Sequence, residues 1–117
     1  MKVKGNVTID TACAKTAVEK RENAIIAAED ASSASMKTAL TTRLTALSAA
    51  WGQTDTAARE AALKAAHSAF KGSWKTTSTT LRTARKAAWS TFKTDAKACK
   101  ISIPSVEASA ETSDSQM

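Results

Sequence analysis

Apolar residues along the first half of the chain recur at spacings that sum to eleven. An eleven-residue repeat corresponds to about 3.67 residues per turn, which keeps a stripe on one face of a nearly straight helix. This is helical periodicity and not strand alternation. With Asp10 as a plausible N-cap, the pattern predicts a helix over residues 10–51. The first row is Val7, Val18, Glu29, Leu40 and Trp51, in which Glu29 is the charged exception, and the second is Ala14, Ile25, Met36 and Leu47.

A second helix is predicted over residues 55–99. Gly52 ends the first helix, and Thr54 or Asp55 caps the next. The large side chains of this segment project into an arc of about 40° at about 100° per residue. An internal repeat is also visible, because KAAHSAFK at 64–71 returns as KAAWSTFK at 86–93, an offset of 22 residues. The residues in the arc are Leu63, Phe70, Trp74, Leu81, Phe92 and Cys99.

These two helices predict an all-α fold, a hairpin of two long antiparallel amphipathic helices over residues 10–100. Residues 1–9 form an N-terminal extension, and residues 101–117 form an acidic, Ser-rich tail that we expect to be disordered. The alternative is a four-helix bundle, with both helices broken midway, at residues 32–35 and at Gly72. We favour the hairpin because one glycine costs a helix only about 1 kcal/mol. Three Gly and one Pro in 117 residues also indicate few turns.

The net charge of +6 is placed unevenly along the chain. Residues 10–51 are balanced, whereas residues 52–100 carry ten bases against three acids. Nine of the ten bases project into an arc of roughly 120° beside the apolar stripe. They predict binding to nucleic acid or another polyanion without sequence specificity; the alternative is neutralisation by acids of the first helix or of the tail. The nine are Lys64, Lys71, Lys75, Arg82, Arg85, Lys86, Lys93, Lys97 and Lys100.

Two cysteines, Cys13 and Cys99, would lie near the same end of an antiparallel hairpin. A disulfide between them would close a loop of more than 80 residues and contribute about 4 kcal/mol in the chain-entropy model. The alternative is two free thiols. We predict the disulfide.

The chain lacks the residues that enzymes of known classes combine. It has one histidine, His67, and no tyrosine, and no carboxylate–histidine pairing typical of metal sites in helical bundles. We therefore expect no enzyme activity, no metal and no cofactor. His67 is predicted to be half-buried beside the apolar arc. Glu22 either lies at a solvated edge or pairs with Arg85 or Lys86 across the hairpin.

Most aromatic residues are predicted to be core, because aromatics at helical spacing usually are. Trp89 projects away from the main arc toward the basic residues, and we expect it to be partly exposed. A third face of the second helix carries a row of Ala and Thr residues. It resembles the ice-binding helices of type I fish antifreeze proteins, but we expect close helix packing through its small residues. This face comprises Ala58, Ala61, Ala65, Ala69, Thr76, Thr80, Thr83, Ala87, Thr91 and Thr94.

Three segments resemble Ala-rich helical proteins of ultra-small candidate-phyla bacteria: CAKTAVEKRENAIIAA, AAWGQTDTAAREAALKAA and RTARKAAWSTFKTDAKAC. The resemblance covers residues 10–99 and implies an exported precursor with a cysteine near each end of the helical region. It implies no activity. Export or a cell-surface location is therefore favoured over the cytoplasm.

The sequence predicts a non-enzymatic structural or binding protein that self-associates as a homo-oligomer along its apolar stripes. No run of 18 apolar residues occurs, so no transmembrane segment is expected. The alternatives are a surface-active helix protein, acting on a membrane surface or on ice, and a subunit of a filament or assembly.

Overall fold

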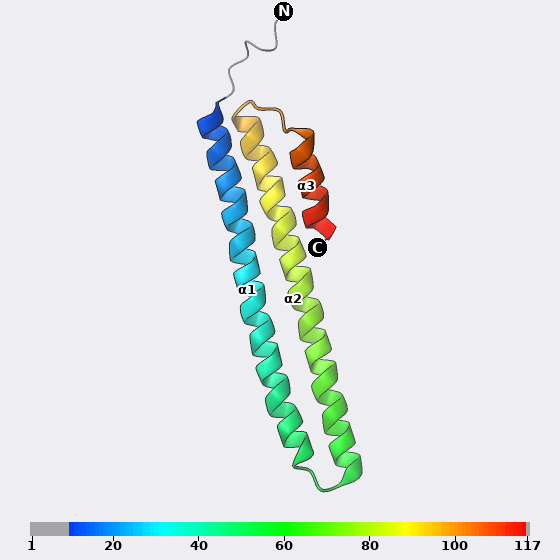
Figure 1. Ribbon diagram of the computed structural model, residues 1–117. Coiled ribbons are helices and arrows are strands. Elements are labelled where there is room, and N and C mark those ends of the chain that lie inside the picture. Colours follow the sequence, from blue (N-terminus) through cyan, green and yellow to red (C-terminus); the bar gives the residue numbers. More distant parts are fainter. Residues whose placement is uncertain (1–9, 117) are drawn as a thin grey trace, which may run out of the picture. The chain divides into compact units, whose positions relative to one another are not determined.

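The computed structural model describes residues 10–116, which form three α-helices and no strand. They are α1 (Thr11–Trp51), α2 (Thr56–Ala98) and α3 (Ser105–Gln116). The two long helices pack against each other, which confirms the predicted all-α hairpin (Figure 1). The described chain divides into two compact units: unit 1 contains residues 10–28 and 82–116, and unit 2 contains residues 29–81. The predicted extension over residues 1–9 lies outside the described residues.

Local side-chain caps determine where the long helices begin. The carboxylate of Asp10 accepts a hydrogen bond from the Cys13 amide at 3.0 Å, as predicted for an N-cap. Asp55 does the same for α2, accepting from the Ala58 amide at 2.8 Å. Between them Gly52 follows the last residue of α1, and its amide donates to the Ala49 carbonyl at 3.0 Å. The turn therefore lies where the sequence predicts it.

Neither predicted weak point interrupts its helix. α1 continues through residues 32–35, and α2 continues through Gly72. A Cβ atom added at Gly72 would meet nothing within 4 Å, so this glycine lies in open space and serves no close approach. The four-helix alternative is wrong because both helices are continuous.

Small residues mediate much of the contact between the helices in each unit. The buried apolar residues are mostly alanines, so the helix backbones can approach closely and the larger side chains lie to the side. In unit 1 Ala17 packs with Trp89 and Phe92, which are 2% and 3% exposed. In unit 2 the buried residues are Ala39, Ala50 and Ala66.

α2 ends in a Schellman motif. The Ile101 amide donates to the Ala96 carbonyl at 3.1 Å, and the Lys100 amide donates to the Lys97 carbonyl at 3.0 Å. Lys100 adopts φ of 58°, the left-handed conformation that this motif requires. The chain then turns back, and Pro104 precedes α3.

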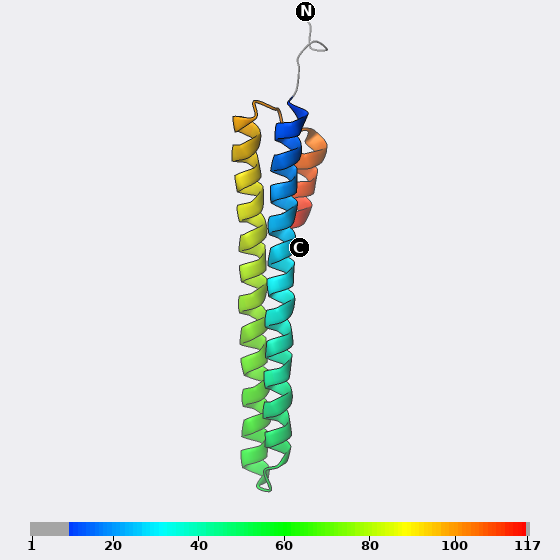
Figure 2. The same cartoon turned by 90° about the vertical axis from the view of Figure 1, so that its left-hand side faces the viewer.

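Helix α3 differs from the prediction of a disordered tail. Figures 1 and 2 show it lying beside the part of the hairpin that belongs to unit 1. None of its residues is buried, and its Val106 is 73% exposed. Because an isolated helix of 12 residues is marginal in water, its stability depends on polar contacts with the hairpin. Sequence composition does not reveal those contacts.

Candidate anion-binding surfaces and the α3 contact

The basic residues predicted to bind a polyanion are divided between the two units. Lys64, Lys71 and Lys75 belong to unit 2, and all three are exposed. All three lie on α2, and their ammonium groups face solvent. A ligand in solution can therefore reach them.

Unit 1 contains the other six basic residues, and two of them have different roles. Arg85 is only 6% exposed, so its guanidinium is not a surface group. Lys93 pairs with Glu111 of α3. Lys93 is itself exposed, and the four other exposed bases of unit 1, which make no described pair with α3, are Arg82, Lys86, Lys97 and Lys100.

Helix α3 contacts the hairpin through three carboxylates. Glu107, Glu111 and Asp114 lie at positions i, i+4 and i+7, which places them on one face of a helix. Glu107 Oε2 accepts from Arg21 Nη1 at 2.7 Å, and Asp114 Oδ2 accepts from Trp89 Nε1 at 2.7 Å. Glu111 pairs with Lys93. Neutralisation of the basic surface by the acidic tail, one of the two sequence-based alternatives, therefore occurs at Lys93.

Arg21 lies at the centre of this contact and is 7% exposed. Its guanidinium carbon lies 4.1 Å from the centroid of the Trp89 ring and 4.5 Å from that of Phe92. Two carboxylates balance its charge, Glu107 and the neighbouring Glu22, whose Oε2 accepts from Arg21 Nε at 2.8 Å. A desolvated guanidinium of this kind needs both its ion pairs and its aromatic contacts.

Arg21 is not among the residues that the sequence pattern predicts to be functional. The signal that could have identified the contact is the spacing of the tail acids, which matches one helical face in a segment otherwise read as disordered. For Glu22 the first of the two alternatives holds: it lies at a solvated edge, 51% exposed, and its partner is the adjacent Arg21 and not a base across the hairpin.

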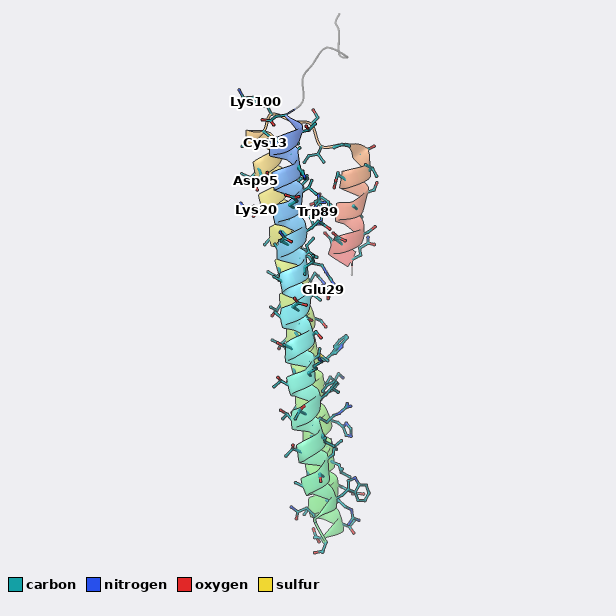
Figure 3. All side chains as sticks on the ribbon, turned by 60° about the vertical axis from the view of Figure 1, so that its left-hand side comes forward. Cys13, Lys20, Glu29, Trp89, Asp95 and Lys100 are labelled. Atoms are coloured by element: carbon teal, nitrogen blue, oxygen red, sulfur yellow. A yellow bond between two sulfur atoms is a disulfide. The ribbon has the colours of Figure 1, made fainter. Side chains whose placement is uncertain are left out.

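The predictions of a partly exposed Trp89 and a half-buried His67 are both wrong. Trp89 is buried because α3 covers it in unit 1 and accepts its indole N–H, as its position in Figure 3 illustrates. His67 is exposed in unit 2, which contains only parts of α1 and α2. Trp51 and Trp74, predicted as core, are 67% and 54% exposed because the helices of unit 2 pack through alanine.

The predicted disulfide between Cys13 and Cys99 is present, with Cα atoms 5.8 Å apart. It joins α1 to the end of α2 within unit 1. Near it, Lys20 Nζ lies 3.4 Å from Asp95 Oδ2, an ion pair between the same two helices (Figure 3). The covalent and ionic links together fix the register of the hairpin in this unit.

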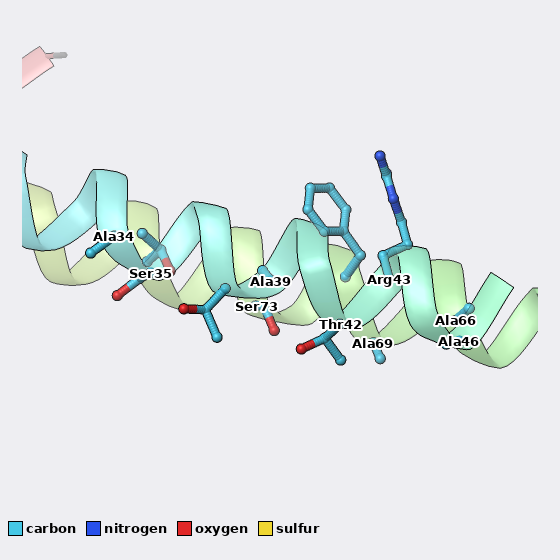
Figure 4. A pocket seen from close by; sticks show the side chains of 12 residues that line it. Ala34, Ser35, Ala39, Thr42, Arg43, Ala46, Ala66, Ala69 and Ser73 are labelled. Carbon is cyan, nitrogen blue, oxygen red and sulfur yellow. The ribbon is translucent and has the colours of Figure 1, made fainter. Parts of the chain in front are cut away.

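The Ala/Thr face of α2 is exposed at all ten positions, so the expectation that it mediates close helix packing is wrong. The alanines that do pack, Ala66, Ala88 and Ala96, lie on another part of the helix surface. In unit 2 small residues of both helices, together with Arg43 and Phe70, also line a groove (Figure 4). Its other lining residues are alanine, serine and threonine, and it holds no cluster of titratable groups.

Within residues 10–116 no group of three or more histidine, cysteine, aspartate or glutamate residues could hold a metal ion. The described helices include none that is long and apolar enough to cross a membrane. Comparisons with protein-family models, with curated proteins and with solved structures found no match for this chain. The resemblance to candidate-phyla proteins stays a prediction.

Proposed function

We propose that this protein is a non-enzymatic binding protein whose exposed basic residues on and beside α2 bind nucleic acid or another polyanion without sequence specificity. The observation that carries the proposal is that eight of the nine basic residues are exposed after folding and that seven of these eight make no described pair with α3. The seven are Lys64, Lys71, Lys75, Arg82, Lys86, Lys97 and Lys100. A polyanion that contacts them releases counterions, and affinity should fall steeply with salt.

The test compares two variants of equal charge. Reversing Arg82 and Lys86 to glutamate removes two cations from the exposed part of α2 in unit 1. Reversing Lys15 and Lys37, which are exposed on α1, changes the net charge by the same amount. Binding to duplex DNA is measured by fluorescence anisotropy over a range of salt concentrations.

The α2 variant should bind more weakly and show a salt slope reduced by about two, because each lost phosphate contact lowers the slope by roughly one. The α1 variant should keep the slope of the unchanged protein. If both variants lost affinity for DNA equally, net charge alone would explain the binding. The assignment of the binding site to α2 would then be wrong.

A second candidate function is adhesion to a surface such as ice. It is supported by the exposure of the whole Ala/Thr face of α2, which would be expected to pack if it were structural. Ice recrystallisation assays with Thr80→Lys and Thr83→Lys test it. Inhibition by the unchanged protein that these substitutions abolish would support adhesion, and no inhibition would exclude it.

A further inference from the structure

The same contact between the two long helices occurs once in each unit. Arg21 and Arg43 are 22 residues apart on α1, and Phe70 and Phe92 are 22 residues apart on α2. Because the helices are antiparallel, moving forward along α1 corresponds to moving backward along α2. The guanidinium carbon of Arg21 lies 4.5 Å from the Phe92 ring centroid, and that of Arg43 lies 4.2 Å from the Phe70 centroid.

The buried alanines repeat with the same offset. Ala17 and Ala88 are buried in unit 1, and Ala39 and Ala66 are buried in unit 2. Ala17 and Ala39 are 22 residues apart on α1, and Ala66 and Ala88 are 22 residues apart on α2. The repeat seen in α2 is therefore part of a two-helix module, an arginine over a phenylalanine beside close-packed alanines, that is present in both units.

In unit 1 this module binds an acidic helix. Three donors of the module face the carboxylates of α3: the guanidinium of Arg21, the ammonium of Lys93 and the indole N–H of Trp89. We call these the donor set of unit 1. They match carboxylates at i, i+4 and i+7 on α3.

The corresponding donor set of unit 2, 22 residues away, is Arg43, Lys71 and His67. It again contains a guanidinium, an ammonium and a ring nitrogen that can donate, so the chemistry is retained although tryptophan is replaced by histidine. Leu44 occupies the position of Glu22, which removes the neighbouring carboxylate that binds Arg21 in unit 1. Within residues 10–116 Arg43 is paired with no carboxylate, and its described contact is the Phe70 ring.

Exposed apolar side chains lie within four residues of Arg43 or Lys71 on the same helices. Leu40, Leu44 and Trp74 are 43%, 68% and 54% exposed. A polyanion such as DNA would gain nothing from these side chains, whereas an amphipathic helix would cover them. The combination therefore favours a helix with both apolar and acidic residues over nucleic acid.

We propose that this face of unit 2 binds an acidic amphipathic helix of a partner protein. Its carboxylates, spaced i, i+4 and i+7, pair with Arg43, Lys71 and His67, and its apolar residues pack on Leu40, Leu44 and Trp74. The site goes beyond polyanion binding, because its ligand is a helix and its central residue, Arg43, lies on α1. α3 in unit 1 is the internal example of this recognition.

The experiment titrates the oxidised full-length protein, labelled with ¹⁵N, with an acetylated and amidated peptide of residues 105–116. The free peptide supplies the required carboxylate spacing, and NMR detects weak binding residue by residue. We expect shifts around residues 40–47 and 63–75. The same peptide with Glu107→Gln, Glu111→Gln and Asp114→Asn should cause none.

Two protein variants separate specific recognition from general attraction. Arg43→Gln should weaken peptide binding about tenfold, the loss expected for one charge-assisted hydrogen bond. Lys37→Gln removes the same charge from an exposed position of α1 and should leave the affinity unchanged. Equal weakening by both variants would overturn the proposal.

Three other results would also overturn it. The peptide could shift only unit 1 resonances by displacing α3, or cause no shift at millimolar concentration. Alternatively, residues 40–47 could broaden with protein concentration in the absence of peptide, which would make a second copy of the chain the occupant. Each result is distinct from failure of polyanion binding, which the Arg82 and Lys86 reversals test separately.

Discussion

Neutralising the three carboxylates of α3 should release this helix from unit 1. The perturbation is the triple variant Glu107→Gln, Glu111→Gln and Asp114→Asn, which keeps side-chain size and removes charge. Glu107 and Asp114 each make one charge-assisted hydrogen bond, worth about 1.5–3 kcal/mol. The Lys93–Glu111 pair is more exposed and adds at most about 1 kcal/mol.

The variant should therefore remove a stabilisation of roughly 3–7 kcal/mol. Little else holds α3, because none of its residues is buried and ordering the backbone costs about 1–2 kcal/mol per residue. The loss should exceed the net stability of the docked helix. Trp89 would then become exposed, and the 12 residues of α3 would lose their helical structure.

Tryptophan fluorescence measures this release when Trp89 is the only tryptophan, in a background with Trp51→Phe and Trp74→Phe. Emission should move to longer wavelength and become quenchable by acrylamide, while circular dichroism reports the smaller helix content. The control variant, Glu19→Gln, Asp30→Asn and Glu60→Gln, removes three exposed acids of the two long helices, so it changes the net charge equally and leaves the α3 carboxylates in place. Unchanged Trp89 emission in the triple variant would refute an electrostatic attachment of α3.

Three further predictions follow from particular contacts. Reducing the disulfide, whose cysteines are 86 residues apart in sequence, should lower the free energy of unfolding by about 4–5 kcal/mol. Intact mass confirms the two added hydrogens, and equal melting temperatures of the two forms would contradict this prediction. Lys100→Gly should raise stability by about 0.5–1 kcal/mol in denaturant unfolding because glycine tolerates positive φ, whereas Lys97→Gly inside α2 should lower it by about 1 kcal/mol. Raising salt to about 1 M should shift the emission of Trp89 much less than the triple variant does, since screening weakens mainly the exposed Lys93–Glu111 pair and acts little on the buried Arg21.

The two long helices could be predicted because their determinants are local. Asp10 and Asp55 cap the helix starts, Gly52 ends α1, and the eleven-residue apolar spacing runs through the segments between them. The disulfide followed from the antiparallel arrangement alone. To predict these features it is enough to know that the two helices are antiparallel. It is not necessary to know which side chains meet in three dimensions.

The α3 contact could not be predicted in the same way, because α3 has the composition of a disordered segment. Its helix depends on Arg21, which is 86 residues away from Glu107 in sequence. Burial of Trp89 depends on the same helix, so an exposure calculated from α2 alone was wrong. The exposure of Trp51 and Trp74 was missed for a different reason. Periodicity identifies an apolar stripe, but it does not show whether the helices bury that stripe or pack through alanines beside it.

The distribution of charge between the units explains how polyanion binding and acidic-helix binding could occur in one chain. Unit 1 has nine bases and seven acids in its described residues, and unit 2 has six bases and four acids, so neither has a large net charge. Attraction for an anion must therefore come from the separation of charges within a unit. In unit 1 three acids are on α3, whereas Arg82, Lys86 and Lys97 remain exposed on α2.

A long polyanion can contact exposed cations of this kind wherever they lie along its backbone, and its affinity should depend on their number. An acidic helix, by contrast, needs three donors at fixed positions, so a single change at Arg43 should matter more than a change at any exposed lysine outside the donor set of unit 2. The two binding modes therefore predict opposite responses to two variants. Reversal of Arg82 and Lys86 should weaken DNA binding and spare the peptide, and Arg43→Gln should weaken peptide binding and spare DNA.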